Sequence, residues 1–253
     1  MTKFKNFYSP NFNKIKRRSS DIKYLIYHYT GMKSEISALK RLCDIRSKVS
    51  CHYFIKKNGE ILQIVPDSYI SWHAGKSYWK KDKMLNKSSI GIEIHNSGHS
   101  FNYTNFNNNQ MISIKKLSNL LIKKYRIKRH NVLGHSDISP DRKKDPGEKF
   151  PWRKLNTYKI GIWHSLDNRL LQKMRNREIL KNQSKIFVKF IKKIGFNFNA
   201  QNKKNFKYTV KAFQRHFRPQ IINGIIDIEC LEIAKNLSKK WSTGAEYIAL
   251  YPF

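Results

Sequence analysis

Two histidines and an aspartate in this 253-residue chain have the types and the settings expected of metal ligands. His28 stands near the end of the dense apolar run IKYLIYHYT, His135 follows the short run NVLG, and Asp145 lies in the loop beyond it. Two imidazoles and one carboxylate, with water in the fourth position, form an arrangement typical of catalytic zinc. None of the three residues is spaced as on one helix, so the fold must bring them together.

Taken singly, each candidate residue also has an ordinary explanation. A lone histidine at a strand end is more often structural than a ligand, and an aspartate before Pro-Gly is normally a turn residue. Glu93, in the run SIGIEIHN, could be a carboxylate that faces solvent. Lys143 lies in the run RKK, where Arg142 or Lys144 could supply the same positive charge. Residue type alone therefore leaves these alternatives open.

The elements that must position these residues can be read from hydrophobic periodicity. The pattern predicts a buried strand from residue 21 to 30, a helix over 34–45, and a hairpin over 50–66 around Asn58-Gly59. It predicts a further strand over 89–96 and an amphipathic helix over 110–126. Strands that alternate with helices indicate an α/β fold, which we expect to be a central mixed β-sheet flanked by helices.

The strand predicted over 89–96 alternates between two faces, with Glu93 on the face opposite its isoleucines. Residues 131–152 predict a short strand and then a long loop, because their glycines and prolines leave little room for helix. After a highly charged stretch at 166–183, which is either a helix or a linker, three amphipathic patterns predict a small C-terminal three-helix domain.

The expected domain organisation has four parts. Residues 1–20 form an N-terminal basic segment, residues 21–165 the domain that carries the candidate site, residues 166–183 a linker or connecting helix, and residues 184–253 the helical domain.

The net charge of +34 is extreme, since 51 Lys and Arg oppose 17 Asp and Glu. A charge of this sign can attract an anionic partner, such as nucleic acid, a membrane surface or an acidic polymer. It can also be compositional drift, which the even spread of Lys along a chain rich in Asn and Ile favours. The chain has no helix-turn-helix, zinc-finger or aromatic-basic sheet motif, so we expect no specific nucleic-acid partner.

Three cysteines, Cys43, Cys51 and Cys230, form no CxxC pair, which argues against a disulfide framework. The N-terminal residues have no continuous apolar stretch of the kind found in signal peptides. No apolar run reaches the ~18–20 residues of a membrane span. We therefore expect a cytoplasmic location by default, with the periplasm or cell envelope as the alternative. The oligomeric state stays open.

Five separated blocks carry a family resemblance: IYHYTG, SCHYFIKKNGEILQIVP, WHAG, SIGIEIHN and GHSDISPDRKKDPG. In this order, across roughly residues 20–155, the chain resembles the N-acetylmuramoyl-L-alanine amidase type 2 family, which is related in fold to peptidoglycan recognition proteins. The C-terminal runs AFQRHF and GIIDIECLEIA resemble a three-helix peptidoglycan-binding domain.

The resemblance implies a role for each matching residue. It makes His28, His135 and Asp145 the ligands of one catalytic Zn²⁺. Glu93 matches the catalytic glutamate of the family, and Lys143 matches a lysine that supports the transition state. His73 and Trp72, in the WHAG block, would contact substrate, whereas His52 is expected to pack or form hydrogen bonds.

The implied activity is zinc-dependent hydrolysis of the amide bond between N-acetylmuramic acid and L-alanine. The partner would be peptidoglycan or its muropeptide fragments, including anhydro-muropeptides. A wall-binding domain favours polymeric substrate, whereas the missing signal peptide favours recycling of internal fragments. The alternative function is a non-catalytic peptidoglycan-binding protein, which would not need both histidines, Asp145 and Glu93 together.

Overall fold

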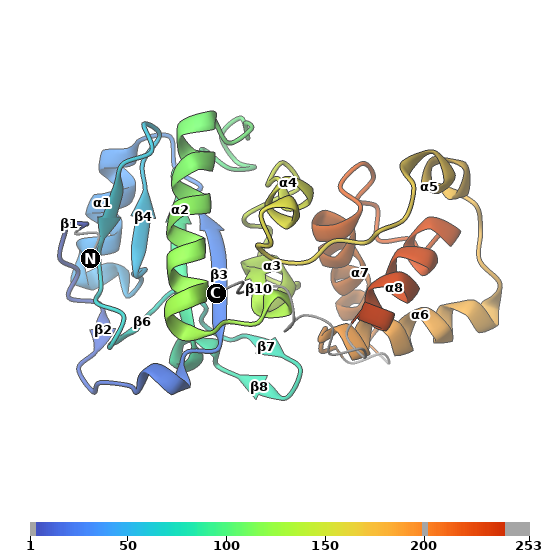
Figure 1. Ribbon diagram of the computed structural model, residues 1–253, viewed down its shortest axis with the longest axis horizontal. Helices are drawn as coiled ribbons and strands as arrows, with labels where there is room; N and C mark the ends of the chain where they lie inside the picture. Colours follow the sequence, from blue (N-terminus) through green and yellow to red (C-terminus); the bar gives the residue numbers. More distant parts are fainter. Residues whose placement is uncertain (1–3, 199–201, 241–253) are drawn as a thin grey trace, which may run out of the picture.

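The computed structural model describes residues 4–198 and 202–240, and its centre is a six-stranded mixed sheet (Figure 1). In spatial order the strands are β1 (Lys5–Asn6), β5 (Ile61–Gln63), β4 (Tyr53–Ile55), β9 (Ser89–Ile94), β3 (Tyr24–Tyr29) and β10 (Val132–Gly134). Only β4 and β5 pair antiparallel, as the hairpin around Asn58-Gly59 predicts, and the other neighbours are parallel. The predicted α/β class with a mixed sheet is confirmed.

The three strands that matter for the site are β9, β3 and β10, which run parallel side by side. Their register pairs His28 with Glu93, and Tyr27 with Gly134, the residue before His135. Because parallel strands end at the same edge of a sheet, the side chains at their carboxyl ends become neighbours. Every residue of β3 except the last is buried, which is typical of a central strand in a parallel sheet.

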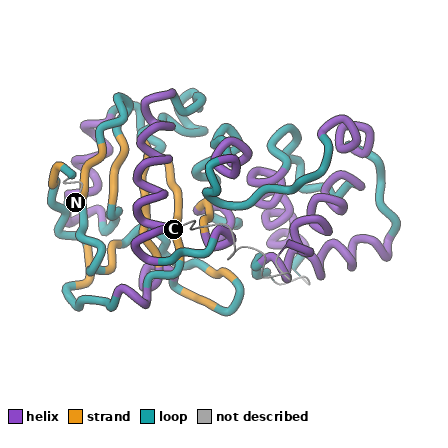
Figure 2. The backbone as a smooth tube through the Cα atoms, in the orientation of Figure 1, coloured by secondary structure: helices purple, strands orange, loops and turns teal. Residues whose placement is uncertain are grey.

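Helices cover both faces of the sheet (Figures 1 and 2). On one face lies α2 (Asn108–Tyr125), whose buried stripe includes Ile114, Leu117 and Leu121. Its Ser118 hydroxyl is 2.5 Å from the hydroxyl of Tyr27 on β3. On the opposite face, α1 (Glu35–Cys43) packs in a smaller apolar cluster with β4 and β5. The part of that face which α1 leaves uncovered holds the candidate site.

Short elements complete the sheet domain. Two ribbons pair β2 (Phe12–Asn13) with β6 (Ile70–Ser71) and β7 (Tyr78–Trp79) with β8 (Asp82–Lys83), and the 3₁₀ turns are Ser19–Asp21, Ile45–Ser47, Leu85–Ser88 and Arg129–Asn131. The described part of the N-terminal basic segment, residues 4–20, contributes strands β1 and β2 to two of the sheets.

The region predicted as a short strand and a long loop, residues 131–152, differs from that prediction because it contains one short helix, and a second helix begins at its last residue. The first is the single turn α3 (His135–Ile138), and the second is α4 (Trp152–Thr157). The carboxylate of Asp137 accepts a hydrogen bond of 2.7 Å from the backbone N–H of Gly134, which satisfies a donor at the start of α3. The prolines lie between the two helices, where the chain is irregular.

The C-terminal region contains α5 (Asn168–Met174), α6 (Lys181–Ile194), α7 (Lys203–Phe217) and α8 (Ile228–Lys240). The last three are the predicted amphipathic helices, and the charged stretch 166–183 holds α5 and an irregular connection. Residues 241–253 of the expected C-terminal domain lie outside the described part. Within the described ranges, we find no helix that is long and apolar enough to span a membrane.

These helices pack directly on the sheet domain through α7 and the segment that follows α6. The ring of His216 stacks on Trp152 with centroids 3.8 Å apart, and its Nδ1 lies 2.7 Å from the carboxylate of Asp137. Phe196 contacts Trp79 with ring centroids 5.0 Å apart. One continuous buried cluster extends from β3 to α8, so the two regions share a hydrophobic core.

Gly195, which ends α6, tests this packing. Its φ is +134°, and a Cβ atom there would lie 2.5 Å from Trp79. We expect Gly195→Ala to lower the free energy of unfolding by about 2–4 kcal/mol, because strain and a core clash add. Gly161→Ala is the matched control, with φ +69° but no contact closer than 3.8 Å, and should cost only about 1–2 kcal/mol. Urea unfolding measures the free energy of unfolding of both variants. Equal losses in the two variants would contradict a clash between the new Cβ atom and Trp79.

Candidate metal centre and active site

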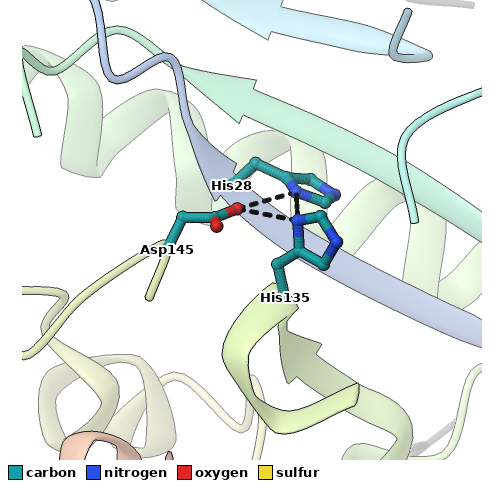
Figure 3. A group of neighbouring side chains, drawn as sticks. All are labelled: His28, His135 and Asp145. Atoms are coloured by element: carbon teal, nitrogen blue, oxygen red, sulfur yellow. Dashed lines mark hydrogen bonds and ion pairs between the residues drawn. The ribbon is translucent and has the colours of Figure 1, made fainter. Parts of the chain in front are cut away.

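Three ligand-type atoms converge in a buried position at the carboxyl ends of β3 and β10 (Figure 3). Nδ1 of His28 lies 2.9 Å from Nδ1 of His135, and Oδ2 of Asp145 lies 3.0 Å from each of these nitrogens. His135 begins α3, directly after β10. The backbone N–H of Ser136 donates to the carbonyl oxygen of Asp145 at 2.9 Å, which brings the loop back to the histidines.

Hydrogen bonds alone do not account for this triangle. Each of its three contacts would need its own proton, while two imidazole nitrogens and one carboxylate oxygen all point to a common centre. Ligands about 2.0–2.1 Å from a tetrahedral zinc lie about 3.3 Å apart, close to the observed spacing. The donor set and its geometry therefore fit one small divalent cation.

The protonation of the triangle also suits a metal. Burial, followed by the nearby His135, lowers the pKa of His28 to about 4, so its imidazole is neutral near pH 7. Burial by itself would raise the pKa of Asp145, but the two histidines outweigh it and hold that pKa well below its usual range. A neutral imidazole and an ionised carboxylate are the forms that bind metal.

The outer nitrogens of both histidines are held by two consecutive residues, His73 and Ala74. Nε2 of His135 donates to the carbonyl oxygen of Ala74 at 3.2 Å. Nε2 of His28 lies 3.0 Å from Nδ1 of His73, whose own Nε2 lies 3.1 Å from the Ser89 hydroxyl. Such outer partners fix which nitrogen of a histidine faces the metal.

The contacts from His28 through His73 to the Ser89 hydroxyl form a relay of hydrogen bonds. The direction of proton donation along this relay follows from Ser89. The Ser89 hydroxyl donates to the carbonyl oxygen of Leu85 at 2.6 Å, so toward His73 it must accept. His73 therefore carries its proton on Nε2, and its Nδ1 accepts from Nε2–H of His28. This arrangement leaves the lone pair on Nδ1 of His28 directed at the metal centre.

The backbone around His73 is shaped to hold its ring. The side-chain oxygen of Asn86 accepts from the backbone N–H of His73 at 3.1 Å and of Ala74 at 2.7 Å. The ring lies against Gly91 of β9, where an added Cβ would come within 2.4 Å of it. Gly91 is thus required for this close approach, a role that the SIGIEIHN block does not reveal by itself.

Glu93 lies beside the metal centre on β9, paired in register with His28. It lines a cleft of about 420 Å³ together with the three candidate ligands. Burial, followed by the charge of Asp145, raises its pKa well above the usual range, while Lys143 opposes that shift. Its Oε2 is buried and has no hydrogen-bond partner among the described residues. A buried acceptor without a donor is rare in folded proteins, so this carboxylate oxygen is a candidate for a functional role.

The three neighbouring cations of the RKK run are placed differently. Arg142 uses its guanidinium to hold the carbonyl oxygen of Lys76 at 2.5 Å and the hydroxyl of Ser139 at 2.8 Å. All three line the cleft, but Arg142 and Lys144 are exposed, whereas Lys143 is half-buried. The charge of Lys143 lowers the pKa of His28 and opposes the rise in the pKa of Glu93.

The remaining predicted residues lie around the same cleft. Trp72 lines it, with its indole N–H donating to Asn13 at 2.7 Å. His73 reaches the lining but is only 8% exposed, with both ring nitrogens engaged. His52 is buried in hydrogen bonds, as expected, to Ser71 and to the N–H of Gly91. Single-residue patterns could not reveal Ser89 and Asn86, because neither residue type is distinctive.

The relay makes a prediction about metal affinity. His73→Ala should weaken Zn²⁺ binding about 10–100-fold, because Nε2 of His28 loses the acceptor that fixes its tautomer. Ser89→Ala should weaken binding less. Competition with a chromophoric chelator measures the affinity. His99→Ala, which removes an imidazole that lines the cleft but contacts none of the three candidate ligands, is the control and should bind zinc normally. Equal affinities of the His73 and His99 variants would contradict the relay.

Comparisons with known proteins agree with this geometry. A family described as N-acetylmuramoyl-L-alanine amidase matches residues 18–148. The N-acetylmuramoyl-L-alanine amidase AmiD of Escherichia coli K12 is 33% identical over 233 residues, which are 87% of this chain and 83% of AmiD. The 1,6-anhydro-N-acetylmuramyl-L-alanine amidase AmpD of Haemophilus influenzae is 31% identical over 61% of this chain and 91% of AmpD.

Solved structures extend the likeness to the helical region. AmiD in complex with anhydro-N-acetylmuramic acid-L-Ala-D-gamma-Glu-L-Lys has a TM-score of 0.77, covering 87% of this chain and 90% of AmiD. AmpDh3 of Pseudomonas aeruginosa in complex with anhydromuramic pentapeptide has a TM-score of 0.76 at 27% identity, covering 92% of this chain and 97% of AmpDh3. The chain belongs to the N-acetylmuramoyl-L-alanine amidase family.

Proposed function

We propose that this protein hydrolyses the amide bond between N-acetylmuramic acid and L-alanine in muropeptides. One observation carries the proposal: Glu93, whose Oε2 has no hydrogen-bond partner among the described residues, lines the same cleft as three converging ligand atoms. A purely binding protein has no use for this combination. Family membership supports the choice of bond.

The resident metal in this proposal is zinc, held by His28, His135 and Asp145. Two nitrogens and one carboxylate oxygen, with room for water, are the donor set of many catalytic zinc sites. When bound, zinc supplies Lewis-acid activation of water and of the scissile carbonyl. The relay through His73 would keep the ligand nitrogen of His28 correctly aimed.

Glu93 acts as the proton carrier. Its raised pKa lets the carboxylate take a proton from the attacking water and return it to the departing amine of L-alanine. The C–N bond breaks as that proton arrives, which leaves a carboxylic acid on the muramic acid and a free amino terminus on the stem peptide. That Oε2 has no hydrogen-bond partner among the described residues supports this role, because no other group competes for its proton.

Lys143 faces the negative charge that develops on the carbonyl oxygen. Its half-buried position in the cleft wall supports this role. A well-placed group of this kind typically lowers the barrier by roughly 3–4 kcal/mol. Arg142 is already engaged with backbone carbonyls, so it positions the loop. Trp72 would contact substrate from the cleft wall.

The substrates in this proposal are soluble muropeptides, anhydro forms included, since the relatives in complex hold anhydro-muropeptides. Residues 21–165 would form the catalytic domain, and the helical region from residue 184 would bind peptidoglycan. To separate soluble from polymeric substrates, intact sacculi and an anhydro-muropeptide are digested side by side and the product masses identified. We expect stem peptide from the anhydro-muropeptide. Release from sacculi alone would contradict the soluble-substrate assignment.

Glu93→Gln tests the catalytic role. We expect turnover of an anhydro-muropeptide to fall about 10²–10⁴-fold, since the amide cannot carry the proton. The variant should still bind one equivalent of Zn²⁺, as measured by metal analysis after dialysis. His95→Gln, a neighbouring change just beyond β9, is the control and should keep turnover. Wild-type turnover in Glu93→Gln would exclude it as the base, and full turnover after zinc removal would exclude the metal.

A further inference from the structure

A second cavity, of about 250 Å³, lies in the helical region, away from the residues of the metal centre. Its floor is buried and consists of side chains from α7, α8 and the segment between them, including Arg218 and Glu229, each 1% exposed. Its rim is exposed and includes Arg153 of α4 and Asn168 of α5. It is thus an open pocket with a polar floor.

Arg218 is the unusual group in this floor. Its Nε and Nη1 are buried and have no hydrogen-bond partner among the described residues. Nη2 contacts the sulfur of Cys230 at 3.1 Å. A buried guanidinium with unused N–H groups is costly, and it is normally satisfied by an acceptor such as a carboxylate. The imidazole Nδ1 of His164, also in the lining, has no partner either.

The charges around the cavity favour an anion. Arg218 is balanced by Asp227 at 3.4 Å and Glu229 at 3.7 Å, but Glu229 is already bound by Arg175 through two contacts of 2.7 Å. Arg153 forms no ion pair within the described ranges. The amide oxygen of Asn168 accepts from its guanidinium and holds it at the rim. The pocket therefore has one more cation than carboxylate.

The size of the cavity and its apolar lining residues limit the kind of anion that it can bind. Pockets for drug-sized molecules are about 300–1,000 Å³, so this smaller cavity suits a small group such as an amino acid or a dipeptide end. Its walls include the apolar side chains of Leu171, Phe217 and Ile233, all buried. They suit small alkyl groups beside a carboxylate.

We propose that this cavity binds a carboxylate-bearing end of a peptidoglycan stem peptide, with Arg218 and Arg153 as its anion contacts. The choice of peptide rests on the proposed function, since stem peptides such as L-Ala-D-γ-Glu-L-Lys carry free carboxylates. The pocket itself is independent of the hydrolytic site. Binding in this cavity would keep the protein attached to stem peptides that have already been released, or to stem peptides that neighbour the one being cut.

The test measures binding of acetyl-L-Ala-D-γ-Glu-L-Lys by calorimetry, against the same peptide with both carboxylates amidated. Arg153→Gln should raise the Kd about tenfold by removing one charged contact at the rim. Lys154→Gln is the matched control, since Lys154 is the exposed neighbour on α4 and does not line the pocket. Arg218→Gln is the second variant and is checked for folding by circular dichroism.

The proposal is overturned if the amidated peptide binds equally well, or if the Arg153 and Lys154 variants bind alike. Displacement of bound peptide by inorganic phosphate at equal concentration would also overturn it, because the site would then be a general anion site. No binding at all means that only water fills the cavity. Because no bond is cut in this measurement, loss of hydrolysis with intact binding would reject the proposed function alone.

Discussion

Three polar atoms from distant parts of the chain are buried within 3.0 Å of one another. The rest of the sheet domain holds them in these positions. Burying such groups without a common partner is unfavourable, so they must be held by a rigid frame. The frame is the parallel set β9, β3 and β10, whose carboxyl ends meet at one edge. The short helix α3 and the bond from Ser136 to Asp145 close the triangle.

The segment His73-Ala74 is the outer support of both histidines. One residue offers a side chain to His28, and the next offers its backbone carbonyl to His135. Asn86 fixes the two backbone N–H groups, and Gly91 leaves space for the ring. Although the WHAG block first suggested a substrate contact, its histidine lies behind His28. Its geometry suits orientation of a ligand better than contact with a bulky substrate.

The helical region is more than an attached module. Through His216 and Asp137 it contacts α3, the same turn that begins with His135. Through Trp152 it joins the core that also holds Tyr27 of β3. Because Asp137 also accepts from Gly134, loss of the helical contact would disturb the residue that precedes a ligand. The cavity near Arg218 lies in this same helical region. The helices that form the cavity therefore also pack against the turn that begins with His135.

Much of this protein could be predicted from sequence. Buried runs and turn signals located β3, β9, the β4–β5 hairpin and α2, because local periodicity decides such elements. Five motif blocks in order pointed to His28, His135, Asp145 and Glu93, whose side chains carry distinctive chemistry. The segment after β10 was less predictable, since its short helix α3 depends on a cap from Asp137 and on packing against α7. Only the tertiary structure decided that Lys143 is half-buried in the cleft wall while Arg142 bonds to backbone carbonyls, and that His73 supports His28. It also decided that Nε and Nη1 of Arg218 lie beside a cavity with no hydrogen-bond partner among the described residues. Those outcomes depend on which groups meet after folding, and residue type and spacing do not specify that.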